Sequence, residues 1–191
     1  MQLLEERIER DGVVLSGNIL KVDSFLNQQL DVELLDQLGA EFKRLFADCG
    51  VNKILTVEAS GIAVACMTAR HFGVPVVFAK KSRSKVTGDS VYSVPVLSFT
   101  HGTVSEIVVS REFIGHGDRV LIIDDFLARG NALLGLIKLA QDAGAQVVGA
   151  GIAVEKAYQD GGSIVRKTGV RVESLARIAS MSETDGIKFV R

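Results

Sequence analysis

Apolar residues recur at helical spacing in the amino-terminal part of the chain. Residues 2–10 alternate charged and apolar side chains with the period of a short helix. Glycines and short apolar runs over residues 12–25 then predict a turn-rich segment with brief extended pieces. From Asp31, a residue type that caps helices, leucines and phenylalanines follow a helical period up to Gly50, where we expect a left-handed stop. This stretch predicts a longer helix that buries one face.

Continuous apolar runs alternate with helical patterns through the rest of the chain. The buried strands that this pattern predicts occupy residues 53–58, 74–78, 119–123, 146–154 and 170–178. The helices predicted between them occupy residues 62–72, about 131–143 and a segment that ends at Gly169. Two β-rich segments, 90–99 and 103–110, predict a hairpin that interrupts the alternation. The expected fold class is α/β, a doubly wound and mostly parallel sheet with helices on both faces.

Length and composition restrict the function classes. The 191 residues, 47% of them hydrophobic, fit a single domain spanning residues 1–191 and exclude a disordered chain. With 22 Lys and Arg against 23 Asp and Glu, the net charge of -1 gives no field that would attract nucleic acid, and no apolar run reaches the ~20 residues of a membrane span. We therefore expect no nucleic-acid partner and no membrane. Two cysteines fit a reducing cytoplasm.

Candidate chemistry lies directly after the apolar strands, because open parallel sheets bind ligands beyond the carboxyl ends of their strands. The residues at these positions are 58–61, Lys80 and Lys81, 124–132, and Glu155 with Lys156. They supply acids, cations and a glycine-containing turn before a helix. That combination suits a substrate with separated anionic groups and vicinal hydroxyls.

The strongest local element is the segment 120–132. Asp124 and Asp125 are expected to end its strand, and the loop 128–132, with Gly130 in it, turns backbone amides toward the positive end of the next helix. A phosphate fits there. The alternative is that Asp125 or a neighbour merely caps the helix.

The run Ile122-Ile123-Asp124-Asp125 before a glycine loop resembles the 5-phosphoribosyl 1-pyrophosphate (PRPP) signature of type I phosphoribosyltransferases. The segments that are similar to bacterial purine-specific members of this family are 21–27, 58–62, 121–128, 154–156 and 172–178. The resemblance implies the type I fold, with a small hood from about residues 1–30 and the carboxyl-terminal segment, and a flexible β-hairpin loop. It also implies transfer of the phosphoribosyl group from PRPP to xanthine, which gives xanthosine 5'-monophosphate and pyrophosphate in purine salvage.

The resemblance also implies roles for individual residues. Asp124 and Asp125 are the catalytic pair, which holds the ribose hydroxyls and faces an oxocarbenium-like carbon. The residues implied to bind PRPP are Ala128, Arg129, Gly130, Asn131, Ala132, Glu58, Ala59, Ser60, Gly61, Lys80 and Lys81. The residues implied to bind xanthine are Leu20, Asn27, Phe126 and Lys156.

Within the base site, Lys156 is implied to donate to the 6-oxo group and Asn27 to the 2-oxo group, while Phe126 stacks on the purine or simply packs in the core. The chain departs from the family in two places. Alanines and Asn131 replace threonines around Gly130, and Lys80 stands where arginine is frequent, which loses the bidentate fork.

The implied cofactor is Mg²⁺, carried mainly by PRPP, with no metal ligand from the protein. The implied assembly is a homodimer, in which Lys80 or Lys81 covers the pyrophosphate of its own or the other subunit. Three alternatives remain from the sequence: a guanine or hypoxanthine phosphoribosyltransferase, a PRPP-sensing regulator without catalysis, and a Mg²⁺-dependent phosphatase that uses the paired aspartates.

Overall fold

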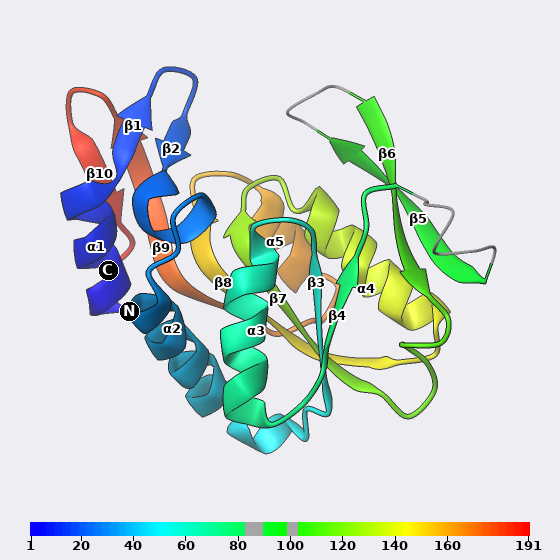
Figure 1. Ribbon diagram of the computed structural model, residues 1–191. Helices are drawn as coiled ribbons and strands as arrows, with labels where there is room; N and C mark the ends of the chain where they lie inside the picture. Colours follow the sequence, from blue (N-terminus) through cyan, green and yellow to red (C-terminus); the bar gives the residue numbers. More distant parts are fainter. Residues whose placement is uncertain (83–89, 99–102) are drawn as a thin grey trace.

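The computed structural model describes residues 1–82, 90–98 and 103–191 and places a mixed sheet at the centre of the molecule (Figure 1). Its strands are β3 (Lys53–Val57), β4 (Val76–Ala79), β7 (Arg119–Leu127), β8 (Gln146–Lys156), β9 (Val172–Ser182) and β10 (Gly186–Phe189). Their order is β10-β9-β8-β7-β3-β4, and the neighbouring strands from β9 to β4 are parallel, whereas β10 pairs antiparallel with β9. The predicted α/β class is confirmed.

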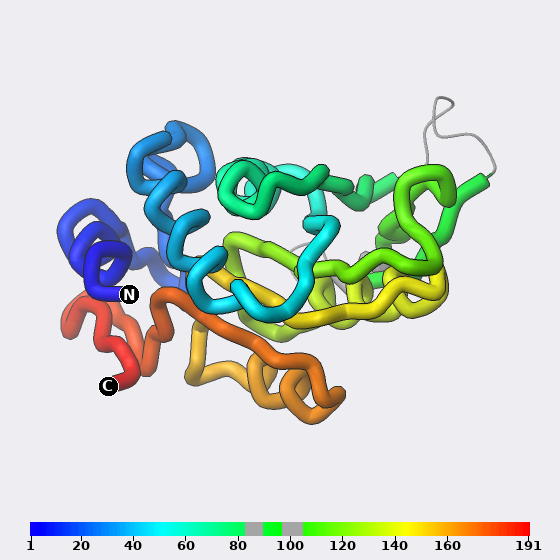
Figure 2. Tube along the Cα trace, turned by 90° about the horizontal axis from the view of Figure 1, so that it is seen from below, coloured from blue at the N-terminus to red at the C-terminus, as the bar shows by residue number. Residues whose placement is uncertain are grey.

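Helices cover both faces of this sheet (Figure 2). The helices α2 (Val32–Leu45) and α3 (Gly61–Phe72) lie on one face, and α4 (Asn131–Asp142) and α5 (Gly161–Arg166) lie on the other. Successive strand residues face opposite sides, so Leu121 joins the apolar core under α2 and α3, whereas Ile122 joins the core under α4 and α5. Both faces of β7 are therefore buried, which explains its unbroken apolar run.

The cap at the start of α2 and the left-handed stop at Gly50 are of the kinds that the sequence predicts, but the helix ends earlier than predicted. The Asp31 carboxylate accepts a hydrogen bond from the Leu34 amide at 3.1 Å and so caps α2, as predicted. The helix stops at Leu45, before Gly50, and a 3₁₀ turn, η2 (Ala47–Cys49), fills the interval. Gly50 then has a φ of 61°, which confirms the left-handed stop but assigns it to the 3₁₀ turn.

The strands at the functional edge are longer than predicted. The expected strand 119–123 runs on to Leu127, because its parallel pairing with β8 continues through Asp124 and Phe126. The aspartates therefore lie inside β7 and do not follow it. The helix expected before Gly169 is reduced to the six residues of α5, and β10 was not predicted.

The two ends of the chain pack together beside the sheet (Figure 1). Helix α1 (Gln2–Asp11), strands β1 (Val13–Leu15) and β2 (Ile19–Lys21) and the π-helical turn η1 (Asp23–Asn27) lie near β10 and the end of β9. The amino terminus donates to the Leu175 carbonyl, and Arg191 pairs with Glu5 at 3.0 Å. We call residues 1–27 together with β10 the hood.

A separate antiparallel hairpin, β5 (Val91–Ser98) and β6 (Thr103–Ser110), confirms the predicted interruption. Backbone hydrogen bonds between Lys80 and Val108 connect it to the end of β4. The implied flexible loop falls on residues 83–89 and 99–102, outside the described residues. Among the residues that are described, no helix is both long and apolar enough to cross a membrane.

Candidate active site

The carboxyl ends of β3, β7 and β8 meet at one edge of the sheet and bring the predicted site residues together. The Glu58–Gly61 turn follows β3, the aspartate pair lies near the end of β7, and Lys156 closes β8. Since these three strands are parallel neighbours, the three groups share the edge where open sheets bind ligands.

Asp124 and Asp125 form a buried acidic pair, with exposed fractions of 5% and 8%. The Asp125 amide donates to the Asp124 carboxylate at 3.0 Å. Burial raises the pKa of Asp124 well above its usual value, the charge of Asp125 raises it further, and the charge of Lys81 opposes the rise. A neighbouring hydroxyl donor or a cation would relieve this concentration of negative charge.

The turn before α3 packs directly on Asp124. A Cβ at Gly61 would lie 2.5 Å from the Thr56 hydroxyl and 2.8 Å from the Asp124 carboxylate, so only glycine fits. Ala59 is exposed, Ser60 is partly exposed, and the Glu58–Ala59 peptide bond is cis.

Thr56 is a residue of this site that the sequence analysis missed. Its hydroxyl is fully buried and finds no hydrogen-bond partner within the described part of the chain. The one sequence signal was a single polar residue inside the apolar run of β3.

The lysines after β4 are brought to the same turn. The Lys81 amide donates to the Glu58 carboxylate at 2.6 Å, which connects the end of β4 to the start of the turn. Lys80 is partly buried through its bridge to Val108, while the Lys81 side chain is exposed. The backbone of Lys81 therefore lies beside the 58–61 turn, while the role of the two ammonium groups stays a prediction.

The loop 128–132 passes into α4 through Gly130, which has a φ of 84° and occupies the N-cap position. Gly130 has no side chain, so the alternative that Asp125 or a neighbour caps this helix is wrong. Ala128, Asn131 and Ala132 are partly buried, and Arg129 is exposed. Backbone amides at the start of α4 remain suited to an anion because they lie at the positive end of the helix.

The loop 128–132 rests on the first turn of α5. A Cβ at Gly161 would overlap the Ala128 carbonyl oxygen and lie 2.6 Å from the Gly130 amide nitrogen. This contact was missed from the sequence, although the pair Gly161-Gly162 signalled a close approach of two backbones.

The predicted base-binding residues lie between β7, β8 and the hood. The Lys156 ammonium donates to the Asn18 carbonyl at 2.8 Å and lies 6.0 Å from the centre of the Phe126 ring, and burial lowers the pKa of Lys156. The Asn27 Oδ1 is buried without a hydrogen-bond partner in the described residues. Leu20 is 6% exposed and its side chain belongs to the core, which leaves only its backbone to face a ligand.

Phe126 is partly exposed and packs against the same core that Leu20 joins. The position agrees with both readings of the sequence, since a ring at the edge of a core can also stack on a planar ligand. Its stacking role stays a prediction.

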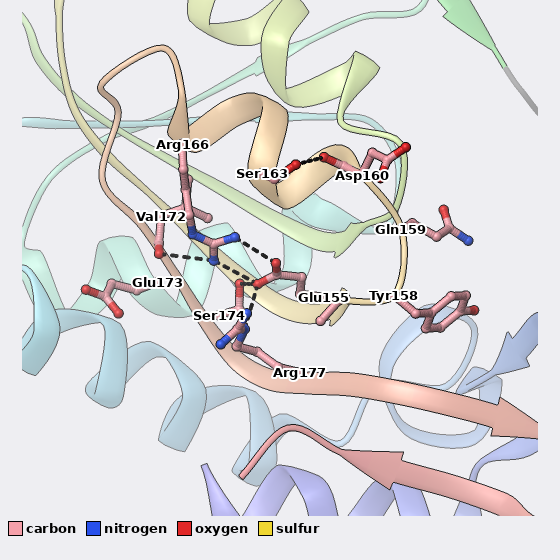
Figure 3. Close-up of a pocket in the computed structure, with 11 residues that line it drawn as sticks. Glu155, Tyr158, Gln159, Asp160, Ser163, Arg166, Val172, Glu173, Ser174 and Arg177 are labelled. Carbon is pink, nitrogen blue, oxygen red and sulfur yellow. Dashed lines mark hydrogen bonds and ion pairs between the residues drawn. The ribbon is translucent and has the colours of Figure 1, made fainter.

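Glu155 does not join Lys156 at the predicted edge. Adjacent strand residues face opposite sides, so Lys156 reaches the hood while Glu155 lies on the α5 side. There it borders a cavity of about 590 Å³ between α5 and β9, with Arg166, Ser174 and Arg177 around its carboxylate (Figure 3). Within the described residues, no group of three or more His, Cys, Asp or Glu side chains could hold a metal ion.

A mostly parallel sheet with a buried aspartate pair, a glycine-containing loop before a helix and strand-end lysines defines a phosphoribosyltransferase of type I. The comparisons agree. Residues 30–173 match the family model of the phosphoribosyl transferase domain, so the chain belongs to that family.

Close relatives extend the match over the full length. The chain is 54% identical over 191 residues to a protein of Lachnoclostridium phytofermentans named xanthine phosphoribosyltransferase, covering 100% of this chain and 98% of that one. It is 50% identical to the protein of the same name from Bacillus cereus, covering 100% of this chain and 96% of that one. The family resemblance expected from the sequence is confirmed.

Solved structures agree on the fold. Adenine phosphoribosyltransferase from Giardia lamblia, complexed with 9-deazaadenine, superposes with a TM-score of 0.76 at 21% identity, covering 91% of this chain and 97% of that one. The adenine phosphoribosyltransferase from Rhodothermus marinus gives a TM-score of 0.72 at 21% identity, covering 93% of this chain and 99% of that one. At this identity the likeness concerns the fold alone.

Proposed function

We propose that this chain transfers the 5-phosphoribosyl group of PRPP to xanthine and so forms xanthosine 5'-monophosphate and pyrophosphate in purine salvage. The observation that carries the proposal is the position of Lys156, at the end of β8, beside the strand that bears Asp124 and Asp125. A base held at Lys156 and a ribose held at the aspartates would therefore meet at one sheet edge. The full-length relatives named for xanthine support the choice of base.

The reaction exchanges one bond at the anomeric carbon. A ring nitrogen of xanthine forms a bond to that carbon, the bond to the pyrophosphate oxygen breaks, and the proton of the ring nitrogen passes to the departing pyrophosphate or to water. Asp124 and Asp125 accept hydrogen bonds from the ribose hydroxyls, and their negative charge stabilises the positive charge that develops on the sugar. No covalent nucleophile is needed.

The anionic groups of PRPP have separate sites. The backbone amides of the 128–132 loop hold a phosphate at the start of α4, where the helix dipole adds to each charge-assisted hydrogen bond. The 58–61 turn holds the pyrophosphate, and Lys80 and Lys81 cover it. This cover keeps water away from the activated sugar.

Mg²⁺ is the proposed cofactor, carried mainly by the pyrophosphate oxygens of PRPP. When bound, it neutralises charge on the leaving pyrophosphate. The residues fit such an ion, because Asp124 and Asp125 place two buried carboxyl groups at the same edge, where a nearby cation would favour their ionised forms.

The base site accepts purines with a 6-oxo group and rejects purines with a 6-amino group. Lys156 presents a donor that a 6-oxo group accepts, whereas a 6-amino group would meet it with a second donor. A buried unpaired polar group can reject an analogue by roughly 10⁴ or more, so this contact excludes adenine. The Asn27 amide, whose Oδ1 has no partner among the described residues, serves the 2-position.

We also propose a homodimer in the cytoplasm. Its support is the family resemblance, which implies that Lys80 or Lys81 covers the pyrophosphate of its own or the other subunit. Light scattering coupled to gel filtration measures the mass directly, and a monomer at assay concentrations that retains full activity would refute the dimer.

The test is nucleotide formation with PRPP, Mg²⁺ and, in separate reactions, xanthine, guanine, hypoxanthine, adenine and orotate. Xanthosine monophosphate should form fastest. If guanine or hypoxanthine were preferred, the residues assigned to PRPP binding would stand, but the role of Asn27 at the 2-oxo group would be wrong. Absence of product with every base, with retained PRPP binding, would favour the regulator, and hydrolysis of a generic phosphate ester would favour the phosphatase.

A further inference from the structure

Glu155 is a buried carboxylate that the proposed reaction does not use. Its exposed fraction is 2%, and Arg166 approaches both of its oxygens, at 2.8 and 2.9 Å (Figure 3). The Ser174 hydroxyl donates at 2.6 Å and the Arg177 Nε at 3.3 Å. One carboxylate therefore joins β8, α5 and β9.

The carboxylate is ionised at neutral pH. Burial alone would raise the pKa of Glu155, but the hydrogen bonds from Arg166 and Ser174, together with the charges of Arg166 and Arg177, outweigh burial and lower the pKa below its usual value. A bidentate pair between arginine and an ionised carboxylate is strong and fixes orientation as well as distance. The pair therefore holds α5 at a set position over β8.

Two glycines allow α5 to lie directly between Glu155 and the phosphate loop. A Cβ at Gly162 would overlap the Glu155 Oε1 and lie 2.5 Å from the Arg166 Nη1. On the other side, a Cβ at Gly161 would overlap the Ala128 carbonyl and lie 2.6 Å from the Gly130 nitrogen. The first turn of α5 is thus a spacer of bare backbone between the ion pair and the loop.

The contact is equally close from the side of the loop. A Cβ at Gly130 would lie 3.2 Å from the Gly161 Cα and 3.3 Å from a methyl group of Val165. The space between Gly130 and α5 is therefore too small to take a side chain easily, and the loop backbone lies directly against the helix. A displacement of α5 would move the loop or remove the contact that supports it.

We propose that Glu155 and Arg166 are positioning residues for PRPP, which act through Gly161 and Gly162 to fix the 128–132 loop at the end of β7. The inference rests on the proposed function, since it concerns the substrate assigned to that loop. Neither side chain touches PRPP. A shift of the loop moves several backbone amides at once, and a misplacement of about 1 Å can cost roughly 10²-fold.

The substitution Glu155→Gln keeps the shape of the side chain and removes its charge. We expect the KM for PRPP to rise about tenfold, while kcat and the KM for xanthine change less than about twofold. Titration calorimetry without xanthine should show the same loss of PRPP affinity. Arg166→Lys, which keeps the charge but loses the fork, should give a smaller rise of the same kind and provides a second variant if Glu155→Gln does not fold.

Two control variants separate positioning from general stability. Glu173→Gln removes a partly exposed carboxylate beside the same cavity and should leave the KM for PRPP unchanged. Ile114→Val, at a buried core position outside the ion pair, should lower Tm by about 2–4 °C without a selective change of KM.

The outcomes distinguish the inference from the function on which it rests. If the wild-type chain forms xanthosine monophosphate and Glu155→Gln loses only thermal stability, as Ile114→Val does, the positioning role is overturned and the function stands. An equal rise of KM for both substrates overturns the role as well. If the wild-type chain neither forms nucleotide nor binds PRPP, the proposed function fails.

Discussion

The Lys156 ammonium donates a hydrogen bond to the backbone carbonyl of Asn18, at 2.8 Å and across 138 residues of sequence. Asn18 lies in the turn between β1 and β2 and has a φ of 61°, so the hood presents this carbonyl from a left-handed turn. The donor assigned to the 6-oxo group of the base is thus already paired with a carbonyl oxygen. In the proposed complex, a carbonyl of the substrate would replace the Asn18 carbonyl as the acceptor of this hydrogen bond.

The substitution Lys156→Met keeps the length of the side chain and removes its donor. A hydrogen bond to a charged group is worth about 1.5–3 kcal/mol, so kcat/KM for xanthine should fall roughly 10- to 100-fold while the KM for PRPP stays within about twofold. Steady-state kinetics with each substrate varied in turn measures both quantities.

The matched control is Lys138→Met, on the exposed face of α4, where the ammonium pairs with Asp142. This variant should retain wild-type kinetics, because a surface pair contributes at most about 1 kcal/mol and lies away from the site. Lys156 would lose its assigned role if both variants showed the same kcat/KM.

Asn27 should determine which group is accepted at the 2-position of the purine. A carboxamide both donates and accepts, so it can serve a 2-oxo or a 2-amino group by turning over. The acceptor-only carboxylate of Asn27→Asp should favour the 2-amino group and shift the ratio of kcat/KM for guanine over xanthine upward by about tenfold. Competition between the two bases for PRPP, followed by chromatography of the nucleotides, measures the ratio.

A second variant tests the same position without charge. Asn27→Leu offers neither donor nor acceptor and should reduce the advantage of xanthine over hypoxanthine, which has no polar group at the 2-position. An unchanged order of bases in both variants would place Asn27 outside the base site.

The sequence predicted the parts of the fold that depend on local periodicity. The alternation of apolar runs and helical patterns located β3, α3, β7, α4 and β8, and Asp31 marked the start of α2. At the carboxyl end of β7, polar residues led to a wrong prediction of the strand boundary. The sequence predicts that the strand ends at Asp124 and Asp125, whereas pairing with Ile152 and Val154 continues β7 past them. Tertiary pairing decides such an end, and local composition does not.

In the candidate site, too, the sequence predicts some residues and misses others. Residues that follow strands are predicted because parallel strands end at one edge of the sheet, and Asn27 is predicted from the family resemblance. Glu155 was placed with Lys156 because the two are adjacent, but its partners Arg166, Ser174 and Arg177 become neighbours only in the folded chain. The Asn18 carbonyl was equally hidden, because a backbone acceptor leaves no sign in a side-chain pattern.

The raised pKa of Asp124 predicts that its carboxylate destabilises the folded chain at neutral pH. Burial first, and then the charge of Asp125, raise the pKa of Asp124 in the folded chain above that in the unfolded chain. Such a carboxyl contributes most to stability below its unfolded pKa of about 3.9 and loses that contribution as pH rises through the folded value. Asp124→Asn should therefore be more stable than the wild type at pH 7.

We expect Asp124→Asn to raise Tm by about 2–4 °C at pH 7, which corresponds to ~1 kcal/mol for a chain of this size, and to lower kcat/KM by about 10²-fold or more. The gain in Tm should shrink as the pH is lowered toward 4. Asp48→Asn, at an exposed position, is the control and should change neither quantity. A Tm below that of the wild type at pH 7 would contradict the assignment.

Gly61→Ala tests whether the turn before α3 sets the position of Asp124. The added Cβ would lie 2.5 Å from the Thr56 hydroxyl and 2.8 Å from the Asp124 carboxylate, so we expect a loss of about 1–3 kcal/mol and a roughly 100-fold lower kcat/KM. Adding Thr56→Ala removes the nearer contact and should restore stability but not activity, since the carboxylate stays displaced. Gly115→Ala, with open space around its Cβ, is the control. Joint recovery of stability and activity in the double variant would show that Asp124 had not moved.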